Sequence, residues 1–206
     1  MQYTVLRTLT VALLAGAVTA PQATATAAQG LLPSLPLRGG STFDFCLTDT
    51  SASALSKAGI TMEAIAPSTL VSDQGHRCVR TVLAGGKINS DLSGLTATAK
   101  DGGFAFHRGN RRAEFTAIAA KISPDRTGTI TVTHRKQRID VLTTKLTGLK
   151  LSLTKITAKN VPMSLTPAGA NALAKEFTTS PLPAGHVLFA GNSTAQVLPL
   201  TASTGK

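Results

Sequence analysis

The stretch TGTITVTHRKQRIDVLTTKL, residues 127–146, decides the fold class of this 206-residue chain. Isoleucine and valine alternate with threonine over its first half, which is typical of a strand with one buried and one exposed face. Residues 135–137 can reverse the chain, and a second strand of the same kind follows over 138–146. We therefore predict an antiparallel hairpin whose basic residues gather at its tip.

Similar short segments, separated by glycine and proline, make up much of the remaining chain. Each segment has strand length and is rich in β-branched or aromatic residues, whereas strong helix-forming runs are rare. We predict further strands over residues 42–47, 60–65, 78–83, 104–107, 113–122, 149–153 and 187–190. No repeat with a period of 20 to 50 residues is present, so a solenoid is not expected.

Two short helices are expected beside these strands. Asp49 can cap a helix that ends before Gly59. Thr166 can cap a second helix in which Pro167 takes the first position and Leu173 packs inward. Together these elements predict a mainly β fold, a single β-sandwich-like domain of antiparallel strands with two short helices.

The first 28 residues have the features of an export signal. Arg7 precedes an apolar run over 11–18, and small residues follow at 25–27. A membrane anchor is the alternative, but a spanning helix needs about 20 apolar residues. We therefore predict a secreted or cell-surface protein with no integral membrane segment after cleavage. The predicted parts are a signal peptide at 1–28, an extended arm at 29–41, a β domain at 42–200 and a tail at 201–206.

Cys46 and Cys78 are the two cysteines of the chain. An exported protein meets an oxidising compartment, where two cysteines favour a disulfide over free thiols. A zinc site is the alternative, because His76 lies two residues before Cys78. Since no ligand pair has the spacing of a zinc site, we predict the disulfide and no metal centre.

The net charge is +11, and twelve lysines or arginines lie between residues 108 and 159 against three acidic residues. Such an excess attracts polyanions. Nucleic acid is not the expected partner, because tryptophan is absent, the only tyrosine is Tyr3, and no basic helix is predicted. An exported basic face can instead meet an anionic polymer of the cell envelope, lipid head groups or an acidic protein, and a solvated surface is the simplest interpretation. The predicted basic face consists of Arg108, Arg111, Arg112, Arg135, Lys136 and Arg138.

No catalytic motif is present, so we predict a protein that is not an enzyme. The chain lacks a Gly-x-Ser-x-Gly nucleophile turn, a phosphate-binding loop and a dinucleotide fingerprint. Its four histidines lack the spacing that places two imidazoles on one side of a helix. His107 and His134 are the candidate ligand-binding residues, because each ends a strand and borders a basic turn.

Three stretches resemble the HtaA-domain family of secreted and cell-surface proteins, which is associated with haem uptake. Residues 94–106, GLTATAKDGGFAF, are similar to the family's strand, Gly-Gly turn and apolar strand. Residues 127–132, TGTITV, are similar to a later strand. Residues 165–173, LTPAGANAL, are similar to the helix near the domain's end, and Gly185 follows in the family's order. The resemblance covers about half of the chain.

The resemblance implies an all-β domain with short helices and, in the haem-binding members, a tyrosine that ligates iron. This chain departs from that pattern, because no tyrosine follows Tyr3. Neutral imidazole also ligates haem iron, so His107 and His134 are the candidate replacements. The leading hypothesis is an exported, non-enzymatic binding or structural module with haem as its candidate cofactor. The alternative is an electrostatic adaptor that docks its basic face onto anionic envelope polymers.

Overall fold

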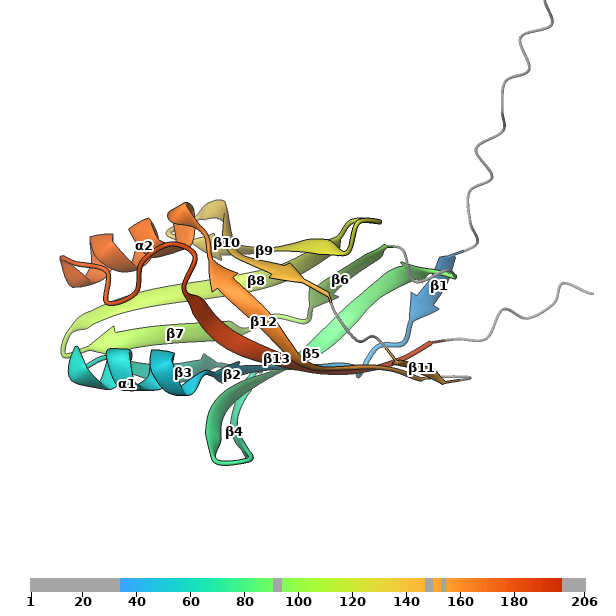
Figure 1. Cartoon of the computed structure of the whole chain (residues 1–206), viewed down its shortest axis with the longest axis horizontal. Coiled ribbons are helices and arrows are strands. Elements are labelled where there is room, and N and C mark those ends of the chain that lie inside the picture. The colour runs from blue at the N-terminus through green and yellow to red at the C-terminus, as the bar shows by residue number, and fades with distance from the viewer. Residues whose placement is uncertain (1–33, 91–93, 147–149, 153–154, 198–206) are drawn as a thin grey trace, which may run out of the picture. The chain divides into compact units, whose positions relative to one another are not determined.

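The computed structural model describes residues 34–90, 94–146, 150–152 and 155–197 (Figure 1). The predicted signal peptide at 1–28 and the predicted tail at 201–206 lie outside the described residues. Of the predicted arm at 29–41, residues 34–37 form the first strand.

The described residues form a mainly β structure with two helices. The helices are α1 (Asp49–Lys57) and α2 (Pro167–Phe177). The strands are β1 (Ser34–Leu37), β2 (Thr42–Leu47), β3 (Thr61–Ile65), β4 (Thr69–Asp73), β5 (His76–Asn89), β6 (Leu95–Ala99), β7 (Gly103–Arg108), β8 (Arg111–Ile122), β9 (Thr127–His134), β10 (Gln137–Lys145), β11 (Lys150–Ser152), β12 (Lys155–Leu165) and β13 (Val187–Gln196). The predicted hairpin over 127–146 is confirmed as β9 and β10, whose residues pair from Gln137 and His134 onward.

Eight strands close into a ring in the order β5, β2, β13, β12, β10, β9, β8 and β6, with β6 pairing back onto β5. All of these pairings are antiparallel, as predicted. The predicted sandwich is wrong, because β6 joins the two edges that a sandwich would leave open. Register shifts in β5 after Leu83 and in β8 after Thr116 accompany this closure, and such irregularities bend a strand.

The remaining strands extend the barrel. β7 pairs with the first half of β8, and β3 pairs with β7. β4 and β1 pair with the two halves of β5, and β11 pairs with β12. β7 and β3 therefore extend the same sheet from the first half of β8.

Both helices begin at threonine caps. Thr166 accepts a hydrogen bond from the backbone nitrogen of Gly169 at 2.9 Å and Pro167 opens α2, as predicted. α1 is capped by Thr48 rather than by the predicted Asp49. The hydroxyl of Thr48 accepts from the nitrogen of Ser51, so the carboxylate of Asp49 lies in the first turn.

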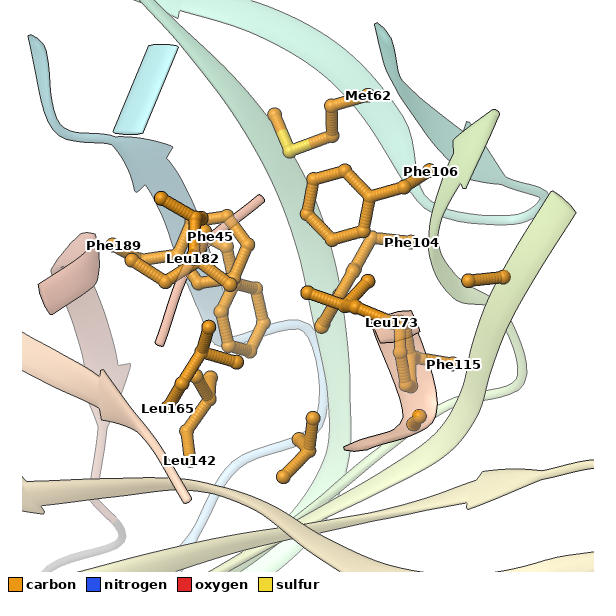
Figure 2. Packing of buried hydrophobic residues seen from close by; sticks show 14 of the residues in the cluster. Phe45, Met62, Phe104, Phe106, Phe115, Leu142, Leu165, Leu173, Leu182 and Phe189 are labelled. Atoms are coloured by element: carbon orange, nitrogen blue, oxygen red, sulfur yellow. The ribbon is translucent and has the colours of Figure 1, made fainter. Parts of the chain in front are cut away.

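A cluster of aromatic side chains fills the barrel near the helices (Figure 2). Its ring centroids lie 4.6 to 6.4 Å apart, within the range of favourable aromatic contacts. Leu173 of α2 and Leu55 of α1 pack into the same core. The fully buried phenylalanines are Phe45, Phe104, Phe106, Phe115, Phe177 and Phe189.

The opposite end of the barrel is less completely filled. A cavity of about 90 Å³ lies there, and residues of all eight barrel strands line it. Small side chains at several lining positions leave this space unfilled, because larger ones would extend further into the barrel. These lining residues include Ala97, Ala120, Ala158 and Ala195. An eight-stranded barrel is just wide enough to be filled by side chains or to hold one small ligand.

The predicted disulfide joins Cys46 and Cys78, which are directly paired residues of β2 and β5. Both cysteines are buried. The bridge therefore links two adjacent barrel strands.

Candidate functional site

His107 lies on the outer face of the sheet formed by β3, β7 and β8. Its neighbour Phe106 is fully buried in the aromatic core, and successive side chains of a strand point to opposite faces. The His107 side chain is 33% exposed. The structure thus leaves this predicted ligand within reach of a molecule on the outside of the barrel.

One charged side chain, Glu63, contacts the His107 ring on that face, and Arg112 and Glu114 extend the same network of ion pairs. Nδ1 of His107 lies 3.0 Å from Oε1 of Glu63, which comes from the neighbouring strand β3. Nδ1 is shielded from solvent, and its contact with Glu63 is an ion-pair contact rather than a well-aligned hydrogen bond. Arg112, opposite His107 on β8, lies 3.5 Å from Oε2 of Glu63 and 3.2 Å from Oε1 of Glu114.

The ion pairs of this outer-face cluster, defined as Glu63, His107, Arg112 and Glu114, contribute little to the stability of the fold. Partly exposed ion pairs contribute about 0–1 kcal/mol each. The carboxylate faces Nδ1, and no hydrogen bond to Nε2 of His107 is formed within the described part of the chain. Nε2 is therefore the atom of this ring that a ligand can reach.

His134 lies on the inner face and is 8% exposed. Its ring stacks on Phe115 with centroids 5.1 Å apart, and its Nδ1 lies 2.9 Å from the carbonyl oxygen of Glu114. Nε2 of His134 lies 3.4 Å from Oε1 of Glu176 on α2. Both ring nitrogens thus face protein groups, and the ring joins β9 to α2.

The two predicted ligands therefore do not converge. His107 follows the buried Phe106 and points outward, whereas His134 has the same orientation as the buried Val132 two residues earlier. They occupy opposite faces of the sheet, so they cannot hold one iron between them.

The predicted basic residues contact several different parts of the protein. Arg108 donates to the carbonyl oxygen of Phe177 at 2.6 Å, with its guanidinium 5.7 Å from the centre of the Phe177 ring. Arg111 donates to the hydroxyl of Thr178. These two arginines connect the β7–β8 hairpin to the end of α2.

The other basic residues lie on the hairpin of β9 and β10 and on β8. Arg135 pairs with Glu176, and that hydrogen bond raises the pKa of Arg135. Arg138 donates to the carbonyl oxygen of Ala117 at 3.2 Å. Lys136 lies in the turn with a positive φ, and Arg112 belongs to the outer-face cluster. Docking onto an anionic polymer stays a prediction.

The described residues contain neither a candidate metal site nor a helix that could span a membrane. No group of three or more histidine, cysteine or acidic side chains that could hold a metal ion occurs among residues 34–90, 94–146, 150–152 and 155–197. None of the helices in those ranges is long and apolar enough to cross a membrane.

The barrel cavity is too small for haem. Pockets for drug-sized molecules have volumes of about 300–1,000 Å³, and the cavity here has about 90 Å³. A porphyrin would therefore have to lie on the outside of the barrel. Of the two candidate histidines, His107 is the more exposed, while His134 lines a surface hollow of about 540 Å³ beside α2.

The sequence did not reveal Glu63 and Glu176 as partners of the two histidines. Glu63 is 44 residues from His107 and approaches it only because β3 pairs with β7. The alternation of residues 61–65 was the available signal, since it places Thr61 and Glu63 on one face. It did not identify the strand that would pair with them.

Comparison with known proteins supports the fold. No protein-family model matches the chain, and no curated protein matches it. Among solved structures it is similar to the C-terminal domain of HtaA from Corynebacterium glutamicum, with a TM-score of 0.57 and 14% identity over 79% of this chain and 99% of that one. It is also similar to heme binding protein HtaB from the same organism, with a TM-score of 0.50 and 12% identity over 81% of this chain and 96% of that one.

These likenesses confirm the predicted HtaA-like resemblance at the level of the fold. Identities of 14% and 12% do not carry residue roles from one protein to another. Any ligand of this chain must therefore be argued from its own side chains.

Proposed function

We propose that this chain is an exported, non-enzymatic haem-binding module whose iron ligand is Nε2 of His107. The position of His107 carries the proposal, because its ring is partly exposed on the outer face and its Nδ1 faces Glu63 at 3.0 Å. The fold shared with heme binding protein HtaB supports haem as the ligand.

The carboxylate beside Nδ1 suits an iron ligand. Histidines that bind metals usually donate their second ring N–H to a carboxylate or carbonyl, which fixes the tautomer and makes the metal-binding nitrogen more basic. Glu63 lies 3.0 Å from Nδ1 of His107, and we propose that the two groups come into hydrogen-bond alignment when Nε2 binds iron. Arg112 lies in the same cluster and offers a positive charge for a haem propionate.

Export is the second part of the proposal. The predicted signal peptide supports it, and so does the Cys46–Cys78 disulfide, because disulfides persist in oxidising compartments. The absence of a catalytic motif supports a binding role rather than catalysis.

A haemin titration followed by Soret absorbance tests the proposed ligand. It is made in about 1 M salt, where the Debye length of about 3 Å suppresses binding by surface charge alone. We expect a saturable shift in the wild type, loss of the shift in His107→Ala, and affinity lowered about 10- to 100-fold in Glu63→Gln.

Two histidine variants provide controls. His76→Ala removes a ring of similar exposure, 38%, that also faces a carboxylate, Asp49 at 3.4 Å, so it should leave haemin binding unchanged. His134→Ala should retain the shift but lower the free energy of unfolding. An unaltered Soret shift in His107→Ala would reject His107 as the ligand, and no shift in the wild type would reject haem.

A further inference from the structure

We propose that the end of the barrel opposite the helices binds the hydrocarbon end of a long-chain carboxylate, with its anionic headgroup held by the surrounding lysines. This site is separate from His107 and does not depend on haem binding. The apolar cavity and the distribution of charge around it carry the inference independently.

The cavity suits a hydrocarbon because barrel strands surround it and its lining is almost entirely apolar. Thr81, Thr144 and Ser193 are its polar residues among those that line it. A dry apolar cavity has no partners for a water molecule, whereas it can accept an apolar ligand. Burial of methylene groups there removes apolar surface from water.

The cavity volume sets how much of a chain can enter. At about 90 Å³ the cavity is well below the roughly 300–1,000 Å³ of pockets for drug-sized molecules, so it can take only the end of an alkyl chain. The lining reaches Ile122, the last residue of β8, and Leu146, which follows β10. The cavity therefore extends toward this end of the barrel, and we place the rest of the alkyl chain and its headgroup there.

Positive charge surrounds that end. The cationic residues lie in the last residues of β5, β8 and β10, the first residues of β11 and β12, and the β8–β9 turn, and all of them are exposed. They are Lys87, Lys121, Arg126, Lys145, Lys150 and Lys155. We call these six residues the basic rim.

Among the described residues, one acidic side chain lies in the turns and strand ends of the basic rim. In the described turns and strand ends there, the acidic side chain is Asp125, which accepts hydrogen bonds from the nitrogen and hydroxyl of Thr127. Lysine stems are long and flexible enough to reach across a rim while their ammonium groups stay in water. An apolar cavity inside a basic rim matches an amphiphile with an anionic head.

Isothermal titration calorimetry with monomeric dodecanoate tests the proposal. Residues 32–206 form one compact unit, so the titration is made with the whole chain and with residues 1–28 removed. We expect one dodecanoate to bind with a negative heat-capacity change, as burial of apolar surface requires. Dodecyltrimethylammonium, with the same chain and a positive head, should bind at least about tenfold more weakly.

A cavity-filling variant locates the alkyl chain. Ala158→Leu adds three carbons inside the barrel and should weaken dodecanoate binding at least about tenfold. Ala52→Leu makes the same change on the exposed face of α1 and should have no effect. Ala97→Leu is a second filling variant from β6, should Ala158→Leu fail to fold.

A charge variant tests the headgroup. Lys145→Gln combined with Lys155→Gln should weaken binding about three- to tenfold at low salt and little at high salt, since exposed pairs are weak and screened. Lys57→Gln combined with Lys175→Gln removes the same charge from the two helices. This control should bind dodecanoate like the wild type.

An isotope-edited NMR experiment needs no variant. Dodecanoate labelled with ¹³C at its terminal methyl should show nuclear Overhauser contacts to methyl groups of Ala120 and Ile130. Absence of binding, absence of these contacts, or equal binding by folded Ala158→Leu would overturn the proposal. So would binding only to vesicles that contain phosphatidylglycerol, because that would assign the basic rim to a membrane surface.

The haem proposal and the dodecanoate proposal can each be rejected without rejecting the other. His107→Ala should leave dodecanoate binding unchanged, and Ala158→Leu should leave the haemin titration unchanged. Loss of both activities in either variant would contradict the assignment of two independent sites.

Discussion

Replacing Phe104 with alanine tests how strongly the aromatic cluster supports the barrel. Phe104 is fully buried, and its ring centroid lies 5.3 to 5.9 Å from those of Phe45, Phe106, Phe115 and Phe189. Truncation of a core phenylalanine costs about 3–5 kcal/mol. Because four ring contacts are lost together, we expect the upper part of that range, about 4–5 kcal/mol.

Urea unfolding followed by far-ultraviolet circular dichroism measures this loss, because the chain has no tryptophan and its only tyrosine is Tyr3. Phe43→Ala is the matched control. Phe43 is half-buried and has one ring contact, to Phe45 at 4.6 Å, so we expect about 2 kcal/mol. If Phe104→Ala cost no more than Phe43→Ala, the cluster would not be the main support of the barrel.

Three further variants test the disulfide, a turn and a close backbone approach. Replacing Cys46 and Cys78 by serine removes a bridge over 32 residues and should cost about 3–4 kcal/mol by denaturant unfolding in the loop-entropy model. The Thr127 hydroxyl lowers the pKa of Asp125 below 3.8, so the carboxylate stabilises the fold above that pH and this contribution is lost as pH falls through the folded pKa. Asp125→Ala should therefore destabilise the protein at pH 7 and lose its effect in strong acid, as thermal unfolding across pH would show. Gly103→Ala should abolish the cooperative unfolding transition, because its Cβ would lie 1.9 Å from a backbone oxygen of β8.

Local patterns in the sequence were sufficient for most individual elements. The alternation over 127–146 identified β9, β10 and their turn, and Thr166 with Pro167 identified the start of α2. These signals lie within a few residues of each other, so no distant contact is needed to read them. β12 was missed over 155–165, where lysine, asparagine and proline interrupt the apolar pattern.

Closure of the barrel could not be read in the same way. It depends on β6, whose sequence LTATA has small side chains and a weak alternating pattern. β6 pairs locally with β5, as Lys87 does with Thr96, but the ring closes only through its pairing with β8, as of Thr96 with Lys121. A sandwich and a barrel present the same local strand signals, so the choice between them required the pairing itself.

Strand orientation distinguishes the two candidate histidines, and it was available from the sequence. Phe104 and Phe106 are inward residues, so His107 must point outward, whereas His134 shares its orientation with Ile130 and Val132. What the sequence lacked was the partner of each ring. Glu63 lies beside Nδ1 of the outward-facing His107, which leaves Nε2 of that ring as the proposed ligand. α2 covers the inward-facing His134, whose Nε2 lies beside Glu176. Two residues with similar local sequence thus acquire different chemistry from the strands and helix packed against them.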